Sequence, residues 1–164
     1  MQEPDAFKAP IAGPSIQYTS QRPPTNADQI TFVLNELLVA GVSAYAAAEL
    51  AEFYQDRVGE EIALSELYEI AAKIQTLYRE DDFIFTRVIV PAQQIEGGIV
   101  RLDVIEAVIE EAVVEEPEAP VGPVKALAER IVSVLVGQVN PTGAMLERAL
   151  FALNEIPGVT RATA

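Results

Sequence analysis

The spacing of apolar residues changes near position 80, and this change restricts the fold more than any other feature of the sequence. Before it, apolar side chains recur every three or four residues, as they do on the buried face of an α-helix. These side chains are Leu64, Leu67, Ile70, Ala71, Ile74, Leu77 and Tyr78. After it, residues 83–90 and 99–107 follow a period of two, which indicates β-strands. A long amphipathic helix must therefore pack against a sheet formed by these strands.

Two further elements precede this helix. Residues 30–39, ITFVLNELLV, predict a strand that is closed by Gly41. Helical spacing then links Leu50 to Val58, and Gly59 follows as a C-terminal cap. The element order is β-α-α-β-β. It predicts an α+β fold in which two helices lie on one face of a three-stranded sheet.

The last two strands form a predicted hairpin. Residues 91–98, PAQQIEGG, are rich in turn formers, and Gly97-Gly98 suits a turn that needs positive φ angles. We expect the Gln93 side chain to help tie the hairpin, and a role in recognition is the alternative. Residues 99–107 alternate between inward and outward positions. The inward residues are Val100, Leu102 and Val104.

Residues 109–164 begin the same plan again. Residues 109–115 predict a short strand, residues 125–136 a helix, and Pro141 lies near the start of another helix. The apolar residues Leu146, Ala149, Leu150 and Leu153 lie 79 positions after Leu67, Ile70, Ala71 and Ile74. This internal repeat predicts a second copy of the domain. The copy is truncated, because residues 158–164 would open a strand with no hairpin partner after it.

We therefore divide the chain into three predicted parts. Residues 1–29 carry five prolines and predict an extended leader. Residues 30–108 form a complete domain, and residues 109–164 form a partial one that lacks its final strand. No run approaches the roughly 20 apolar residues of a membrane-spanning helix. The first ten residues also lack the basic and apolar regions of a signal peptide, so we expect neither feature in this sequence.

Charge and composition disfavour several functions. The 25 acidic and 11 basic residues give a net charge of −14, which disfavours binding to nucleic acids and anionic membrane surfaces. The chain has no histidine and no cysteine, so it lacks the side chain best suited to acid–base work and the thiolate metal ligands. We predict that the chain is not an enzyme, and that it has no catalytic residue, no metal site and no cofactor.

Two acidic clusters have ordinary structural explanations. Residues 106–118 contain six glutamates, scattered along a strand and its exit loop, which is typical of a solvated surface rather than a cation site. Asp81 and Asp82 directly follow a helix, so we expect turn residues rather than a catalytic pair. Tyr78 continues the apolar stripe and is predicted to lie in the core.

Several segments together resemble a known family. The most specific are LYREDDFIFTRVIVPAQ, the hairpin IEGGIVRLDVIEA, and LERALFALNEIPGV, with FVLNELLVAGVSAY near the start. In this order and at this spacing, residues 30–164 resemble the ShlB-type POTRA (polypeptide-transport-associated) domains of two-partner secretion transporters, the hemolysin activation and secretion type. The chain departs from the family pattern where glycine is usual at Asp82 and Ala107, and where serine is frequent at Ala46.

The resemblance implies a function. Such domains lie in the periplasm ahead of an outer-membrane β-barrel, capture the unfolded N-terminal secretion domain of a partner exoprotein, and pass it to the pore. The barrel would belong to the same polypeptide, downstream of Ala164. The alternative is a periplasmic scaffold or assembly module for outer-membrane proteins, which would bind folded partners through its acidic surface.

The predicted binding mode is β-augmentation, in which an extended segment pairs with a free sheet edge. The family's fold places the last strand in the middle of the sheet, which leaves residues 83–90 at an edge beside the first helix. The predicted partner-binding residues are Phe83, Phe85, Arg87 and Ile89 on this strand, and Phe53 and Tyr54 on that helix. The competing interpretation is that these aromatic residues cover the outer sheet face or pack on a neighbouring domain.

Overall fold

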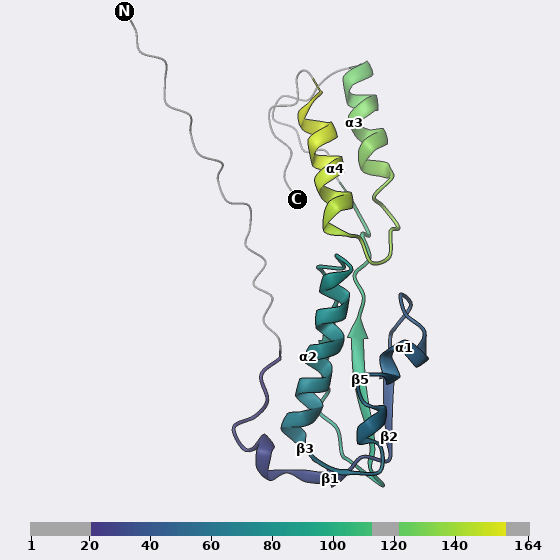
Figure 1. Cartoon of the computed structure of the whole chain (residues 1–164). Helices are drawn as coiled ribbons and strands as arrows, with labels where there is room; N and C mark the ends of the chain where they lie inside the picture. Colours follow the sequence, from purple (N-terminus) through teal and green to yellow (C-terminus); the bar gives the residue numbers. More distant parts are fainter. Residues whose placement is uncertain (1–20, 113–121, 157–164) are drawn as a thin grey trace, which may run out of the picture.

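The computed structural model describes residues 21–112 and 122–156. Residues up to about 108 form an α+β unit in which helices cover one face of a small sheet, and a pair of helices follows it (Figure 1). The predicted fold class is therefore confirmed. Within the described residues, no helix has the length and apolar character needed to cross a membrane.

The main sheet has three strands in the order β2-β5-β4. Strand β2 (Glu36–Ala40) runs parallel to β5 (Ile99–Ile105), and β4 (Arg87–Ile89) runs antiparallel to it, so the sheet is mixed as predicted. The last strand lies in the middle. Glu96 bridges Ile99 across Gly97 and Gly98, whose φ angles of 61° and 73° confirm the predicted two-glycine turn.

The single strand predicted over residues 30–39 is wrong, because the chain bends between two shorter strands. The first is β1 (Thr31–Val33), which pairs antiparallel with β3 (Glu61–Ala63), a strand that was not predicted. At the bend, the N–H groups of Asn35 and Glu36 both donate to the carbonyl of Gly98, at 2.9 and 3.2 Å. Asn35 and Glu36 therefore lie opposite the single residue Gly98. This arrangement is a β-bulge, and it redirects the chain from β1 to β2 in the main sheet.

The helix predicted from Leu50 to Val58 is shorter than expected. It splits into α1 (Ala47–Ala51) and the 3₁₀ turn η2 (Gln55–Arg57), because Tyr54 leaves the helical region with φ at −143°. The Ala46 N–H donates to the Glu49 carboxylate at 2.7 Å, so one half of a capping box persists although Ala46 has no side-chain acceptor. A second 3₁₀ turn, η1 (Ala27–Gln29), precedes β1.

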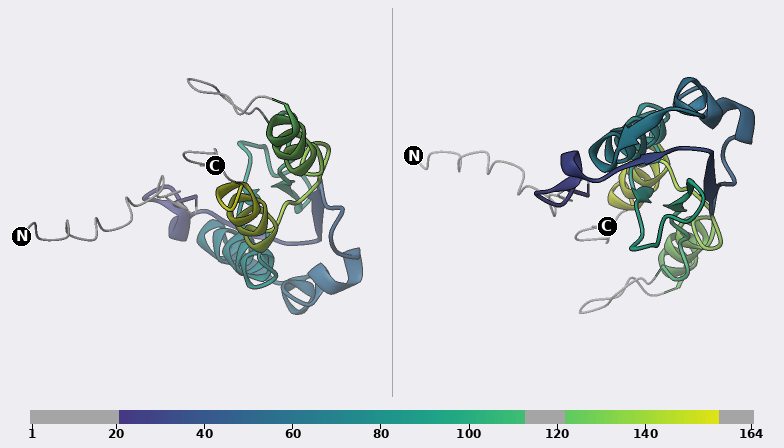
Figure 2. Two further views of the ribbon diagram at one scale, coloured as in Figure 1. Left: turned by 90° about the horizontal axis from the view of Figure 1, so that it is seen from above. Right: turned by 90° about the horizontal axis from the view of Figure 1, so that it is seen from below.

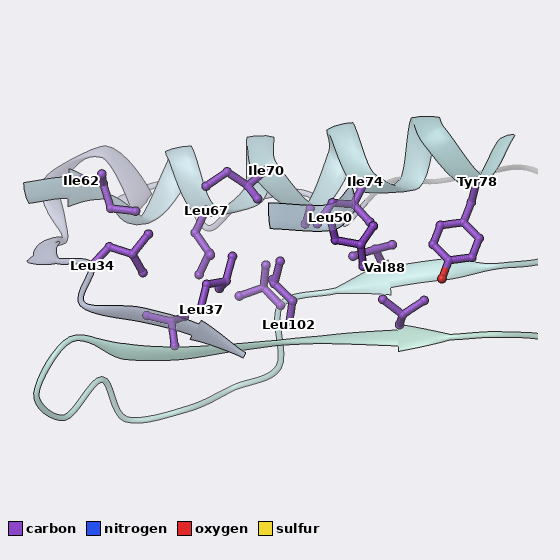
Figure 3. Packing of buried hydrophobic residues seen from close by; sticks show 14 residues of the cluster. Leu34, Leu37, Leu50, Ile62, Leu67, Ile70, Ile74, Tyr78, Val88 and Leu102 are labelled. Atoms are coloured by element: carbon purple, nitrogen blue, oxygen red, sulfur yellow. The ribbon is translucent and has the colours of Figure 1, made fainter. Parts of the chain in front are cut away.

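The long amphipathic helix is α2 (Leu64–Glu80), and it forms the core with the sheet as predicted. Figure 3 shows its side chains Leu67, Ile74 and Tyr78 pointing toward the strands, with Leu37 below Leu67. In β5, the inward residues Val100, Leu102 and Val104 are buried, which confirms the predicted alternation. The core contains fourteen buried residues, all between positions 34 and 104. Burying a side chain such as leucine contributes about 1.5–3 kcal/mol.

The strand predicted over residues 83–90 is mostly wrong, since only Arg87–Ile89 is a strand. Asp82 has a φ of 66°, and the Thr86 N–H donates to the Phe83 carbonyl at 3.2 Å, so residues 83–86 form a turn. The alternation holds only after this turn. Val88 and Val90 are buried, and Arg87 is exposed.

The second part consists of α3 (Pro123–Ser133) and α4 (Gly143–Asn154), close to the predicted helices. Helix α4 lies beyond the C-terminal end of α2 (Figures 1 and 2). Of the strand predicted over residues 109–115, the described part does not form a strand, although Val108 bridges Val139. Residues 113–115, and residues 158–164 with their predicted strand, lie outside the described ranges.

Candidate functional site

The candidate site is the outer edge of β4, the last strand on one side of the main sheet. Arg87 and Ile89 lie opposite Ile105 and Asp103 of β5. Because backbone groups alternate in direction along a strand, Val88 and its neighbours two residues away present their N–H and carbonyl groups to the other side. That side is the edge where an added strand would pair.

The outward N–H groups of this edge already have hydrogen-bond acceptors. The Val88 N–H donates to the side-chain oxygen of Gln75 on α2, at 3.3 Å. The Val90 N–H donates to the side-chain oxygen of Gln21 at 2.7 Å, and the Gln21 amide donates back to the Val90 carbonyl at 3.1 Å. The predicted neighbour of the β4 edge was the first helix. The structure instead brings it against α2.

The two glutamines differ in how easily a partner could replace them. Gln75 is only 5% exposed, so removing its side-chain oxygen would leave the buried Val88 N–H without an acceptor. Gln21 is exposed and reaches the edge from the segment that precedes η1. Its carboxamide offers one donor and one acceptor side by side, which is the same pair that a peptide group offers. An extended chain could take its place at Val90 without leaving a buried polar group unpaired.

The aromatic residue Phe83 lies in a ring cluster rather than on an open strand. Its ring centroid is 5.9 Å from that of Tyr78 and 6.3 Å from that of Tyr45, and the two tyrosine rings meet edge to face at 4.8 Å. Phe85 is half-buried in the turn that precedes β4. The cluster therefore anchors the start of the edge.

The other predicted partner-binding residues are divided between two places. Arg87 is exposed and Ile89 half-buried on β4, so both stay beside the edge. Phe53 and Tyr54 lie between α1 and η2, where they pack on the core, and burial raises the pKa of Tyr54. Phe53 also lines a charged groove of about 240 Å³ between α1, η2 and α2. The binding role of all six residues stays a prediction.

Glu106 is the most strongly bonded acidic residue near the site, and the prediction that it belongs to a solvated surface is wrong. Its carboxylate accepts hydrogen bonds from the Ser43 and Ala44 N–H groups, at 2.8 and 3.1 Å, and from the hydroxyls of Ser43 and Tyr78. Burial alone would raise the pKa of Glu106, but these bonds outweigh it and lower the pKa to about 2. Glu106 thereby joins the end of β5 to α2 and to the loop after β2.

The tyrosines beside Glu106 are held in their neutral form. Burial, followed by the hydrogen bond to Glu106 at 2.8 Å, raises the pKa of Tyr78. Burial and a hydrogen bond to Asp81, at 2.7 Å, raise the pKa of Tyr45. Both hydroxyls therefore act as hydrogen-bond donors. Tyr78 is also fully buried, which confirms its predicted place in the core.

The turn after α2 also holds the second part of the chain. The Asp82 carboxylate accepts the Ala144 N–H at 2.8 Å, and its backbone carbonyl accepts the Gly143 N–H at 3.2 Å. The Thr86 hydroxyl donates to the side chain of Asn140, at 3.1 Å, in a buried position. Asp82 is thus a turn residue as predicted, and it additionally caps the first turn of α4.

The sequence predictions missed Gln21, Gln75 and the role of Glu106. One signal was available, because Gln75 follows Ala71 and precedes Tyr78 at helical spacing, inside the apolar stripe of α2. A polar side chain at a core position needs a hydrogen-bond partner. No local pattern identifies Gln21, whose partner is 69 residues away.

This architecture, with helices on one face of a mixed β2-β5-β4 sheet, is that of POTRA domains. CdiB from Escherichia coli matches with a TM-score of 0.62 at 16% identity, over 85% of this chain and 24% of CdiB. POTRA1-3 of the periplasmic domain of Omp85 from Anabaena matches at 0.58 and 20% identity, over 74% of this chain and 54% of that one. The N-terminal domain of Omp85 from Thermosynechococcus elongatus matches at 0.56 and 24% identity, with 75% and 54% covered. These likenesses establish the fold alone.

Sequence comparison adds the family. Residues 32–107 match the family described as POTRA domain, ShlB-type. The heme/hemopexin transporter protein HuxB of Haemophilus influenzae is 28% identical over 116 residues. The form from strain ATCC 51907 is 29% identical over the same length. The match covers 68% of this chain and 19% of HuxB, so the chain spans about a fifth of the length of these relatives.

Proposed function

We propose that this chain is the periplasmic POTRA segment of a two-partner secretion pore. In this proposal it binds the unfolded N-terminal secretion domain of an exoprotein and passes it to an outer-membrane barrel of the same polypeptide. The ShlB-type family match and the likeness to HuxB support this assignment. The segment itself performs no catalysis and does not insert into the membrane.

The observation that carries the proposal is the contact between Gln21 and Val90. At this point of the β4 edge, a primary amide occupies both the N–H and the carbonyl of one backbone residue. The backbone of an extended client chain offers the same donor and acceptor, repeated every second residue. Capture would therefore begin at Val90, where Gln21 leaves, while the Val88 N–H stays bonded to Gln75.

The energetics suit a transient handover. Each backbone hydrogen bond contributes about 0.5–1.5 kcal/mol net, and the client must first replace the bonds that Gln21 makes. A strand of three residues offers few such bonds, so the side chains beside the edge, Ile89 and Arg87, must add to the affinity. Weak, sequence-tolerant binding is the expected result.

The test is an NMR titration of the labelled chain with the unfolded secretion domain of an exoprotein encoded at the same locus. We expect shifts concentrated at residues 86–90, and tighter binding by Gln21→Ala, since this variant leaves the Val90 backbone free. Gln29→Ala, an exposed glutamine change in the following turn η1, is the matched control. The absence of shifts at the β4 edge at high micromolar ligand would refute capture there.

The second candidate is a periplasmic scaffold that binds folded partners. It is favoured by the charged groove, whose walls include Glu52, Asp56 and Glu69 as well as Lys73. In the same titration, a folded partner would shift the amides of α1, η2 and the first turns of α2. It would leave residues 86–90 unchanged.

A further inference from the structure

The other edge of the main sheet, formed by β2, differs from the β4 edge in its backbone hydrogen bonds. Within the described residues, β2 pairs on one side only, with β5. The Glu36 N–H donates to the Gly98 carbonyl, so Glu36 and the residues two and four positions later direct their backbone groups toward β5. Leu37 and Val39 therefore direct theirs away from the sheet.

A neighbouring strand begins along this edge and then leaves it. The Leu34 N–H donates to the Glu60 carbonyl at 2.9 Å, and the Gly59 N–H donates to the Leu34 carbonyl at 2.6 Å, which extends the pairing of β1 with β3. Gly59 has a φ of 91°, and the residues that precede it belong to the 3₁₀ turn η2 rather than to a strand. The outward backbone groups of Leu37 and Val39 therefore lie beyond the end of this pairing, along a part of β2 that has no neighbouring strand within the described residues.

We infer that the β2 edge is a second strand-binding surface of this domain, and that its occupant is an extended segment of another polypeptide. The inference goes beyond the proposed function and does not depend on capture at β4. Outward N–H and carbonyl groups at every second residue, about 6.6 Å apart, are complementary to an extended backbone. Small ions and side-chain surfaces do not offer alternating donors and acceptors at that spacing.

The side chains beside this edge specify the occupant further. Leu38 lies on the sheet face opposite the helices and is 47% exposed. Val58, which shortly precedes β3, is 44% exposed. Glu36 and Glu60 are exposed near the start of the edge. An extended segment that alternates apolar and basic residues would place apolar side chains against Leu38 and bases near the two glutamates.

The first measurement is amide hydrogen exchange on the full chain without a ligand. The Leu37 and Val39 amides should exchange rapidly, whereas those of Leu38 and Ala40, which face β5, should be protected. The Val88 and Val90 amides should also be protected by their glutamines. Protection of Leu37 and Val39 equal to that of Leu38 would overturn the inference, because the edge would already be covered.

The second measurement adds a soluble peptide of alternating valine and lysine as the probe. We expect exchange at Leu37 and Val39 to slow about tenfold when about nine in ten molecules are bound. Val39→Pro removes the amide at position 39 and should abolish the slowing at Leu37, whereas Val39→Ala should keep it, since proline is tolerated where an edge N–H faces outward. The protected Leu38 amide reports that each variant is folded.

Each outcome of the peptide experiment either supports or overturns the inference of a binding surface at β2. Gln21→Ala should leave the response at β2 unchanged, which separates it from binding at β4. Slower exchange confined to Val88 and Val90, or no change in exchange at either edge, would overturn the inference. Protection of Leu37 and Val39 that rises with protein concentration alone would also overturn it, in favour of pairing between two copies of this chain.

Discussion

At the scale of single residues, glutamine side chains replace a neighbouring strand in the first domain. Gln93 accepts the Arg101 N–H and donates to the Arg101 carbonyl, both at 2.8 Å, which confirms its predicted role in the hairpin. Gln21 makes the same pair of bonds at Val90. Gln75 accepts one N–H from inside the core. Gln93 thus satisfies backbone groups of β5 beyond the end of the short strand β4, whereas Gln21 and Gln75 satisfy groups on the outer edge of β4.

Replacing Gln75 by leucine tests this role. The change makes the side chain apolar at similar size, and it leaves the buried Val88 N–H without an acceptor, which costs about 1–3 kcal/mol. We expect the free energy of unfolding to fall by this amount in urea titrations. Thr76→Ala is the matched control on the exposed side of α2 and should change stability by less than about 1 kcal/mol. Equal stability of Gln75→Leu and the parent chain would contradict this account.

Glu106 gives a prediction about acid stability. Its folded pKa of about 2 lies below the ordinary value of 4.5, so ionised Glu106 stabilises the fold above about pH 4.5, and this contribution is lost as the pH falls toward 2. Glu106→Gln should therefore be less stable than the parent chain near neutral pH, by about 1.5–3 kcal/mol for the lost bonds to a charged group.

Urea midpoints measured between about pH 6 and pH 2 check this prediction. The difference between Glu106→Gln and the parent chain should shrink as the pH approaches 2. Glu110→Gln, which removes an exposed carboxylate four residues away, should follow the parent profile at every pH. A difference that stays constant across the range would mean that the ionised carboxylate is not the stabilising group.

At the scale of elements, local patterns predicted α2, β5 and the Gly97-Gly98 turn, because each depends on neighbouring residues alone. The errors share a different cause. The break in the first strand depends on the Gly98 carbonyl, more than sixty residues away from Asn35. The turn over residues 83–86 depends on the Phe83 ring packing against Tyr45 and Tyr78. Contacts between distant residues override local periodicity at such positions.

The sequence predicted the location of the candidate site but not the side chains that occupy it. Its position at a sheet edge followed from the family resemblance, and the structure has β4 at the end of the sheet. The glutamines that occupy its outward N–H groups could not be assigned from periodicity, because side-chain hydrogen bonds leave no regular pattern in a sequence. Gln75 was the exception, as the polar residue within an apolar stripe.

The joint between α2 and α4 yields an element-scale prediction. Asp82 holds a φ of 66°, which is uncommon for a residue other than glycine, and its carboxylate caps the Ala144 N–H. Asp82→Gly should relieve the backbone and lose the cap, whereas Asp82→Asn should keep both the conformation and an acceptor. We expect faster hydrogen exchange at Ala144 in Asp82→Gly and little change in Asp82→Asn.

A control exists on the same helix turn. The Met145 N–H donates to the Thr142 hydroxyl at 3.2 Å, so Thr142→Ala should expose Met145 rather than Ala144. If Asp82→Gly left the Ala144 amide as protected as in the parent chain, the cap across the two parts would make no contribution. In that case the family's usual glycine at this position would be equivalent to Asp82.

At the scale of the whole molecule, the two parts of the chain differ in how much apolar surface they bury. The core cluster lies entirely between residues 34 and 104. In residues 122–156, the buried apolar side chains are Ala128, Val132 and Ile156, while Val134 and Phe151 are 65% and 68% exposed. Since burial of apolar surface is the main stabilising contribution, we expect residues 122–156 to be less stable than the first part.

Native-state hydrogen exchange of the full chain measures this difference. Amides in the middle of α2 and β5 should exchange only through global unfolding, and those of α3 and α4 should exchange through smaller openings with a lower free energy. Contacts such as Asp82 with α4 couple the two parts, so Asp82→Gly should lower the opening free energy of α4 while leaving α2 nearly unchanged. Equal protection of α2 and α4 in the parent chain would show that the two parts unfold as one cooperative unit, which their unequal cores do not predict.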